Sequence, residues 1–218
     1  MYLCEQKVEA HMQRALAISV TVGVAPFPLP ADLGLTTQEQ QRYDKLRGTP
    51  RASSWLAGRA ALKRVLSQLG ESTDTSELAF PHARVSLTHS GRYAVALGVP
   101  KNVGIVGVGI DLEMNKSLNP QGDRFFLTPA EWAWVRSCPV QYQAGERLRL
   151  WTVKEALFKA QPHNSEAMLF DYHVETPSAH TGTGINHKTC AVRFSYSSLS
   201  LAEGILSVAI SQPREVYS

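Results

Sequence analysis

Two nine-residue segments of this 218-residue chain resemble each other: Trp55–Lys63 (WLAGRAALK) and Trp151–Lys159 (WTVKEALFK). Both have tryptophan, alanine, two apolar residues and lysine at the same offsets, and both read as a helix with paired strand-like runs further along the chain. An internal repeat of this kind indicates a duplicated unit. We therefore predict an α+β fold of two similar α/β subdomains related by a pseudo-two-fold axis. The predicted halves are residues 1–104 and 105–218, and the ligand cleft is expected between them.

Apolar periodicity and turn residues predict the individual elements. Helices are predicted over 36–44, 52–69 and about 146–161, and another begins at Thr128, which is followed by proline as is typical of an N-cap. Strands are predicted over 15–24, 85–87, 93–99 and 103–112, with a turn at 88–92. The runs 191–201 and 205–211 predict a C-terminal hairpin.

The composition restricts the class of protein. Hydrophobic residues make up 44% of the chain and charged residues 19%, which excludes a disordered or fibrous protein. No run approaches the ~18 apolar residues of a spanning helix, so no membrane span is expected. The three cysteines are widely spaced and cannot form a disulfide framework. A reducing, cytoplasmic setting is therefore the default expectation.

Positive charge is concentrated in one part of the chain. Between Arg42 and Arg64 there are seven basic residues and one acidic residue. This segment either docks something anionic or is a solvated helix face. Few aromatic residues are interleaved with the basic ones, so nucleic acid is not expected as a partner.

Two carboxylates stand at the end of an apolar run, in Gly107–Glu113 (GVGIDLE). A strand points residues i and i+2 to the same face, so Asp111 and Glu113 are predicted to project together. Paired carboxylates suit Mg²⁺, although a plain polar strand end has the same pattern. The glycines at 107 and 109 allow a ligand or a neighbouring backbone to approach closely.

Glu155 and Lys159 are four residues apart, on one face of the predicted helix. They are either an ordinary surface ion pair or groups that face the cleft. In the second case Glu155 supplies a third carboxylate to the metal site, and Lys159 meets a phosphate. The hydroxyls and histidine of Ser86–Arg92 (SLTHSGR) are further donors for a phosphate.

These segments carry a family resemblance. The ordered motifs RxxxWLAGR from Arg51, SxTHS from Ser86, GVGIDLE from Gly107, FFxxxxE from Phe125 and WxxKEAxxK from Trp151 resemble the 4′-phosphopantetheinyl transferases. The chain is most similar to the larger, monomeric, pseudo-dimeric type that serves siderophore, peptide and polyketide synthetases. The resemblance covers about residues 51–159. Each motif is common by itself, but all five in this order are specific.

The resemblance implies a set of site residues. Magnesium ligands are implied at Asp111, Glu113 and Glu155, with Glu131 where some members have a further acid. Coenzyme A contacts are implied at Arg51 (3′-phosphate), Thr88 and His89 (phosphates), Lys154 and Lys159. The chain departs from the family at residues 77–81 (ELAFP), where many members have a G-K-P or R-x-P loop, which puts the adenine contacts in doubt.

The resemblance implies Mg²⁺-dependent transfer of 4′-phosphopantetheine from coenzyme A to a serine of an acyl or peptidyl carrier protein, with release of adenosine 3′,5′-bisphosphate. Glu155 is the expected base and Lys159 the group that stabilises the leaving phosphate. A magnesium-dependent phosphohydrolase and a non-enzymatic nucleotide- or RNA-binding module are the alternatives. Lys63, at the offset of Lys159, is expected to face Arg59 and to lie away from the metal.

Overall fold

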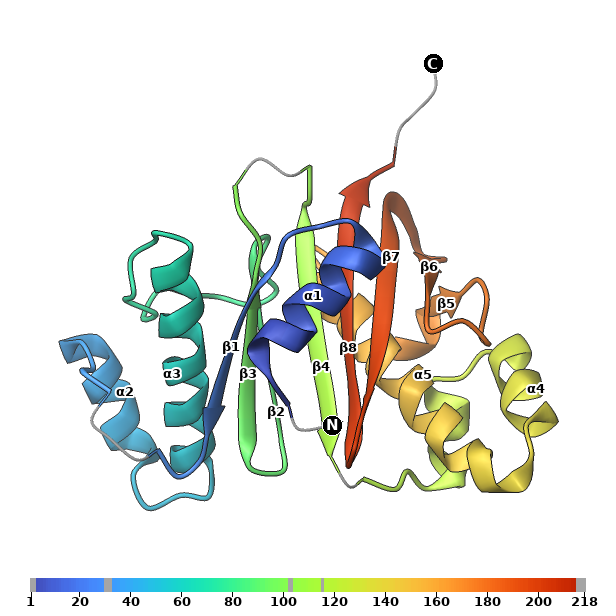
Figure 1. The fold of residues 1–218 in the computed structure, drawn as a ribbon, viewed down its shortest axis with the longest axis horizontal. Coiled ribbons are helices and arrows are strands. Elements are labelled where there is room, and N and C mark those ends of the chain that lie inside the picture. Colours follow the sequence, from blue (N-terminus) through green and yellow to red (C-terminus); the bar gives the residue numbers. More distant parts are fainter. Residues whose placement is uncertain (1–2, 30–32, 102–103, 115, 215–218) are drawn as a thin grey trace.

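The computed structural model describes residues 3–29, 33–101, 104–114 and 116–214 (Figure 1). Two antiparallel sheets stand side by side, with strand orders β1-β3-β2 and β4-β8-β7-β6-β5. Helices α2 and α3 lie beside the first sheet, α4 and α5 lie beside the second, and α1 crosses in front of the strands (Figure 1). The mixed architecture agrees with the predicted α+β class. The sheets have three and five strands, so the halves are not copies strand for strand, and the pseudo-two-fold axis stays a prediction.

The first half contains α1 (Glu5–Leu16), β1 (Thr21–Pro26), α2 (Thr37–Leu46), α3 (Arg51–Gln68), β2 (Val85–Ser90) and β3 (Tyr93–Gly98). Thr36 caps α2 in a capping box with Glu39. Helix α3 packs on the sheet through small residues, because Gly23 of β1 leaves room for the Ala61 carbonyl.

The second half contains β4 (Gly107–Met114), a 3₁₀ helix η1 (Pro120–Phe125), α4 (Pro129–Ser137), α5 (Val140–Ala160) and a second 3₁₀ helix η2 (Leu169–Asp171). Four strands follow: β5 (Tyr172–Val174), β6 (Thr181–Asn186), β7 (Thr189–Leu201) and β8 (Gly204–Pro213). The predicted cap at Thr128 and the β7–β8 hairpin are confirmed.

Side chains join the two sheets where β2 meets β4. The hydroxyls of Ser86, Thr88 and Ser90 accept the backbone N–H groups of Ile110, Leu112 and Met114, at 3.1, 3.2 and 2.9 Å. The residue numbers of the acceptors in β2 and of the donors in β4 increase together, so the two strands run in the same direction. The prediction of a turn from residue 88 was wrong: Thr88 to Ser90 continue the strand, because alternate hydroxyls serve as acceptors for the neighbouring strand.

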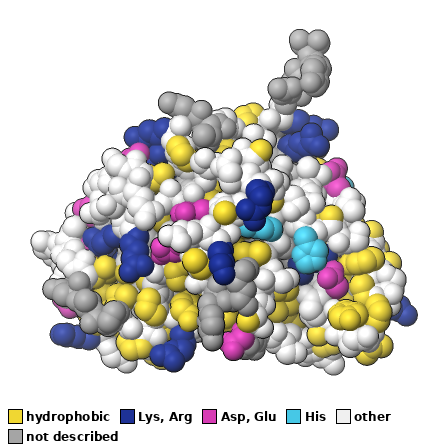
Figure 2. Space-filling view, viewed as in Figure 1, with side chains coloured by type: hydrophobic (Ala, Val, Ile, Leu, Met, Phe, Trp, Pro, Cys, Tyr) yellow, Lys and Arg dark blue, Asp and Glu magenta, His cyan; other side chains and the backbone are white. Residues whose placement is uncertain are grey.

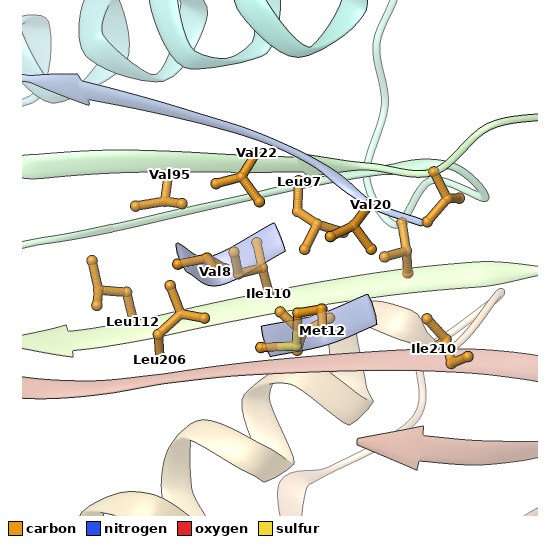
Figure 3. Close-up of a cluster of buried hydrophobic side chains, with 13 residues drawn as sticks. Val8, Met12, Val20, Val22, Val95, Leu97, Ile110, Leu112, Leu206 and Ile210 are labelled. Carbon is orange, nitrogen blue, oxygen red and sulfur yellow. The ribbon is translucent and has the colours of Figure 1, made fainter. Parts of the chain in front are cut away.

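Helix α1 covers a core that both sheets share. Val8 and Met12 of α1 pack against Val22 and Leu97 of the first sheet and Ile110 of the second, all fully buried or nearly so (Figure 3). The predicted boundary at 104/105 therefore separates the two sheets but runs through one hydrophobic core.

The prediction of a strand over 15–24 was wrong in its first part. Residues 5–16 are helical, because Val8 and Met12 form an i, i+4 apolar pair that reaches the core. The carboxylates of Glu9 and Glu5 accept the N–H groups of Val22 and Val24, at 2.8 and 2.7 Å. They thereby satisfy donors on the edge strand β1 that no strand pairs. Among the described residues, no helix combines the length and apolar character needed to cross a bilayer.

Candidate active site

The predicted acids and Lys159 come from strand β4 and helix α5, which lie against each other in antiparallel directions. Glycine makes this approach possible: a Cβ atom on Gly109 would overlap the carbonyl oxygen of Ala156, and one on Gly107 would overlap that of Ala160. The two glycines thus admit a neighbouring backbone rather than a ligand. The close approach brings the α5 side chains over the end of β4.

Asp111 is the most constrained acid of the group, with only 5% of its surface exposed. Its Oδ1 accepts hydrogen bonds from Lys159 Nζ at 2.7 Å and from Thr88 Oγ1 at 3.1 Å. Its Oδ2 is buried and has no hydrogen-bond partner among the described residues. Burial raises the pKa of Asp111 above its usual range, and repulsion from Glu113 adds to this, against the attraction of Lys159.

Glu155 shares the electrostatic field of these groups. Burial raises its pKa, Lys159 opposes the rise, and the negative charges of Asp111 and Glu113 reinforce it. The three predicted carboxylates therefore repel one another across a common space. A bound cation would relieve that repulsion.

Glu113 is held by two side chains that lie outside the predicted site. Lys116 Nζ forms an ion pair with Glu113 Oε1, and Trp151 Nε1 donates to the same oxygen at 3.1 Å. Ser90 Oγ lies 3.4 Å from Oε2. Trp151 belongs to the repeated segment that the sequence pattern singles out, whereas Lys116 carries only the weak signal of standing three residues after an acid.

Within the parts of the chain that are described, no group of three or more His, Cys, Asp or Glu side chains is arranged to hold a metal ion. The reason is visible in the contacts above: Asp111 is turned toward Lys159 and Glu113 toward Lys116. The magnesium ligands therefore stay a prediction.

Lys154 does not contribute to a coenzyme site in this arrangement, which corrects the prediction. Its side chain is fully buried, forms a 2.6 Å ion pair with Glu131 Oε2 and donates to the carbonyl of Phe126. Burial lowers the pKa of Lys154, while Glu131 opposes that shift. Glu131 also accepts the N–H groups of Thr128 and Val174, so it belongs to the interior of the second half rather than to the acid cluster.

The other predicted coenzyme contacts lie in the first half. Thr88 is buried against Asp111 and the backbone of β4, so its hydroxyl already has partners. His89, the next residue of β2, is exposed. Arg51 is exposed at the start of α3.

The expectation for Lys63 was wrong. Its ammonium pairs with Glu39 Oε2 at 2.7 Å and donates to the Thr73 carbonyl, so it faces an acid and not Arg59. Glu39 comes from α2, and sequence spacing along α3 carries no information on that neighbour.

Comparison with known protein families gives a match in the second half of the chain. Residues 107–208 match the model of the 4′-phosphopantetheinyl transferase superfamily. The match spans just under half of the chain and includes Asp111, Glu113, Glu155 and Lys159, while Arg51, Thr88 and His89 lie outside it. No curated protein matches the chain. The match supports the superfamily and a phosphopantetheinyl transferase role in general terms. It does not distinguish the larger pseudo-dimeric subtype.

Proposed function

We propose that this protein transfers 4′-phosphopantetheine from coenzyme A to a serine hydroxyl of an acyl or peptidyl carrier protein and releases adenosine 3′,5′-bisphosphate. One observation carries the proposal: inside the matched region, one carboxylate oxygen of the buried Asp111 has no hydrogen-bond partner in the described part of the chain, and Glu155 and Lys159 share its electrostatic field. A buried oxygen of this kind marks a place for a ligand. We further propose that the protein acts as a monomer in the cytoplasm.

The donor set fits Mg²⁺. Asp111, Glu113 and Glu155 offer the hard carboxylate oxygens that this ion prefers, and the free Oδ2 of Asp111 is an available ligand atom. These three residues would hold Mg²⁺, which supplies neutralisation of the diphosphate charge when it is bound.

Glu155 is the proposed general base. Its carboxylate lies in the electrostatic field of Asp111, Glu113 and Lys159 and is the acceptor for the proton of the carrier serine. The serine oxygen then attacks the phosphorus that bears the pantetheine arm, and the bond to the adenosine phosphate breaks. Lys159, 27% exposed and held by Asp111 and the Ile110 carbonyl, is placed to donate to that departing phosphate.

Arg51 is proposed to bind the 3′-phosphate of coenzyme A from the exposed start of α3. A contact remote from the reacting phosphorus contributes mainly uniform binding. Arg51→Ala should therefore raise the KM for coenzyme A more than it lowers kcat. Wild-type protein should discriminate against dephospho-coenzyme A, and steady-state kinetics of the variant should show that discrimination largely lost. An unchanged preference ratio would place the 3′-phosphate elsewhere.

The carrier protein is proposed to dock beside α4. Trp132 and Phe170 line a hollow of about 540 Å³, and the Arg136 guanidinium lies 4.5 Å from the Trp132 ring centre. An apolar hollow with a basic rim fits an acidic amphipathic segment. Leu127 also lines the hollow, and the residue before it, Phe126, packs edge-on against Trp151, the donor to Glu113.

The decisive experiment is mass spectrometry of an apo carrier protein after incubation with coenzyme A, Mg²⁺ and this protein. We expect the serine to gain the mass of phosphopantetheine, and Asp111→Ala to abolish the gain while the protein remains folded. Coenzyme A cleavage without modified carrier would favour the phosphohydrolase alternative. Neither cleavage nor modification, with retained RNA binding, would favour a binding module. Figure 2 shows that basic side chains on the face that carries α1 form small scattered groups instead of one band.

A further inference from the structure

The acid cluster already contains two cations of the protein itself. Lys159 pairs with Asp111 and Lys116 pairs with Glu113, so two ammonium groups serve three carboxylates. We propose that Lys116 competes with the metal ion for the Glu113 carboxylate, so that metal binding is an exchange in which the Lys116 ammonium leaves Glu113. This inference rests on the proposed function, because it takes Glu113 as a metal ligand.

Lys116 is the lysine that can leave. Its side chain is 40% exposed, against 27% for Lys159, and only Lys159 donates in addition to a backbone carbonyl, that of Ile110. The Lys116 ammonium reaches solvent and is rehydrated when it leaves Glu113, so its release costs less than that of a fully buried partner. Mg²⁺ is a hard divalent cation that binds carboxylate oxygens and keeps most of its other ligands as water, so it can take the place of the ammonium on Glu113.

The Trp151 ring holds the ammonium in place while it is paired. Lys116 Nζ lies 5.1 Å from the centre of that ring, within the range of a cation–π contact. The indole Nε1 donates to Glu113 Oε1, the same oxygen that Lys116 occupies. Trp151 thus orients both members of the pair. This explains why Lys116 pairs with Glu113 although Glu113 is a proposed metal ligand.

The test is calorimetric titration of the full-length protein with Mg²⁺ alone, at constant ionic strength. Lys116→Gln should tighten Mg²⁺ binding by about two- to fivefold, because the ammonium that leaves Glu113 reaches solvent and regains its water. Lys116→Arg should weaken it, because the guanidinium fork binds a carboxylate more firmly than an ammonium does. The matched control is Lys188→Gln. Lys188 pairs with Asp171 at 2.9 Å, and the two carboxylates of these pairs are equally exposed, at 13%.

The outcomes separate this inference from the proposed function. Tighter binding by Lys116→Gln, weaker binding by Lys116→Arg and no change in Lys188→Gln would support the exchange. Equal affinity of wild type and both Lys116 variants would overturn it. Tighter binding by Lys116→Gln with Lys116→Arg equal to wild type would also overturn it, since that pattern reflects the general field of a charge. Asp111→Asn should lose Mg²⁺ binding; if it binds as wild type does, the metal site of the proposed function fails together with the exchange.

Discussion

The two repeated helical segments each end in a lysine that pairs with a carboxylate, yet the two carboxylates differ in how completely they are satisfied. Glu39, the partner of Lys63, also accepts hydrogen bonds from Thr75 N at 3.0 Å and Thr36 N at 2.9 Å, and from the Thr75 hydroxyl. Asp111, the partner of Lys159, has two donors on one oxygen, and its other oxygen has none among the residues that the structure describes.

The pKa values of Glu39 and Asp111 are shifted in opposite directions. Burial alone would raise the pKa of Glu39, but hydrogen bonds from Lys63, Thr75 and Thr36 outweigh it and lower the value to about 2. For Asp111 burial prevails, and the pKa lies above its usual range. The same helical offset therefore supports a structural ion pair in one half and a group with unused binding capacity in the other.

The largest expected contrast is in catalysis. Lys159→Ala should lower kcat by roughly 10²–10⁴-fold, the range for loss of a positioned donor to a leaving group. Lys63→Ala should leave kcat of the folded protein within about threefold of wild type, since its partner Glu39 lies in the first half. Carrier modification rates measured side by side, per mole of folded protein, test this. Equal small effects would remove Lys159 from the catalytic machinery.

The second contrast is in folding stability and has the opposite sign. Lys63→Met should lower the free energy of unfolding by about 3–5 kcal/mol, because it leaves the buried Glu39 carboxylate without its cation. Lys159→Met should cost clearly less, since Lys159 is 27% exposed against 12% for Lys63, so solvent already screens its pair with Asp111. Urea unfolding at pH 7 provides the comparison. A larger loss for Lys159→Met would mean that the two pairs are equally structural.

Acid should affect the first half through Glu39. Its folded pKa of about 2 lies below the ordinary value of 4.5, so its contribution to stability is present above pH 4.5 and is lost as the pH falls toward 2. The loss amounts to roughly 3 kcal/mol by linkage. Between pH 6 and pH 2, the free energy of unfolding measured with urea should change less with pH for Glu39→Gln than for wild type. The same pH dependence of the unfolding free energy in both proteins would show that Lys63 and the threonines do not lower the pKa of Glu39.

The smallest effect concerns Asp111 in the metal-free protein. A raised folded pKa means that the folded state holds the proton more tightly, so ionisation of Asp111 costs stability as the pH rises. Asp111→Asn should therefore raise the melting temperature by a few degrees at pH 7, with a smaller gain at pH 4. Thermal unfolding in the presence of a chelator measures this. A lower melting temperature at pH 7 would indicate that the Asp111–Lys159 pair is structural, like Lys63–Glu39.

Local signals predicted part of the fold. The helix starts predicted at residue 36 and at Thr128 depend on side chains a few residues away, and both are confirmed. Helix α1 was missed because its apolar face is a single pair, Val8 and Met12, which gains meaning only from the core above it. Residues 88–90 were assigned to a turn for a similar reason. The hydroxyls of Thr88 and Ser90 accept hydrogen bonds from a strand 24 residues further along the chain, which no local pattern indicates.

The sequence by itself determined which groups share a face: Asp111 with Glu113 by the two-residue period of a strand, and Glu155 with Lys159 by the turn of a helix. The motif placed Lys154 and Lys159 in one predicted coenzyme site, although five residues put them on different sides of one helix. Only the tertiary structure decided which of these lysines meets Asp111 and which is buried against Glu131. That choice depends on where α5 crosses β4, and the crossing is set by backbone contacts at Gly107 and Gly109 between segments almost fifty residues apart.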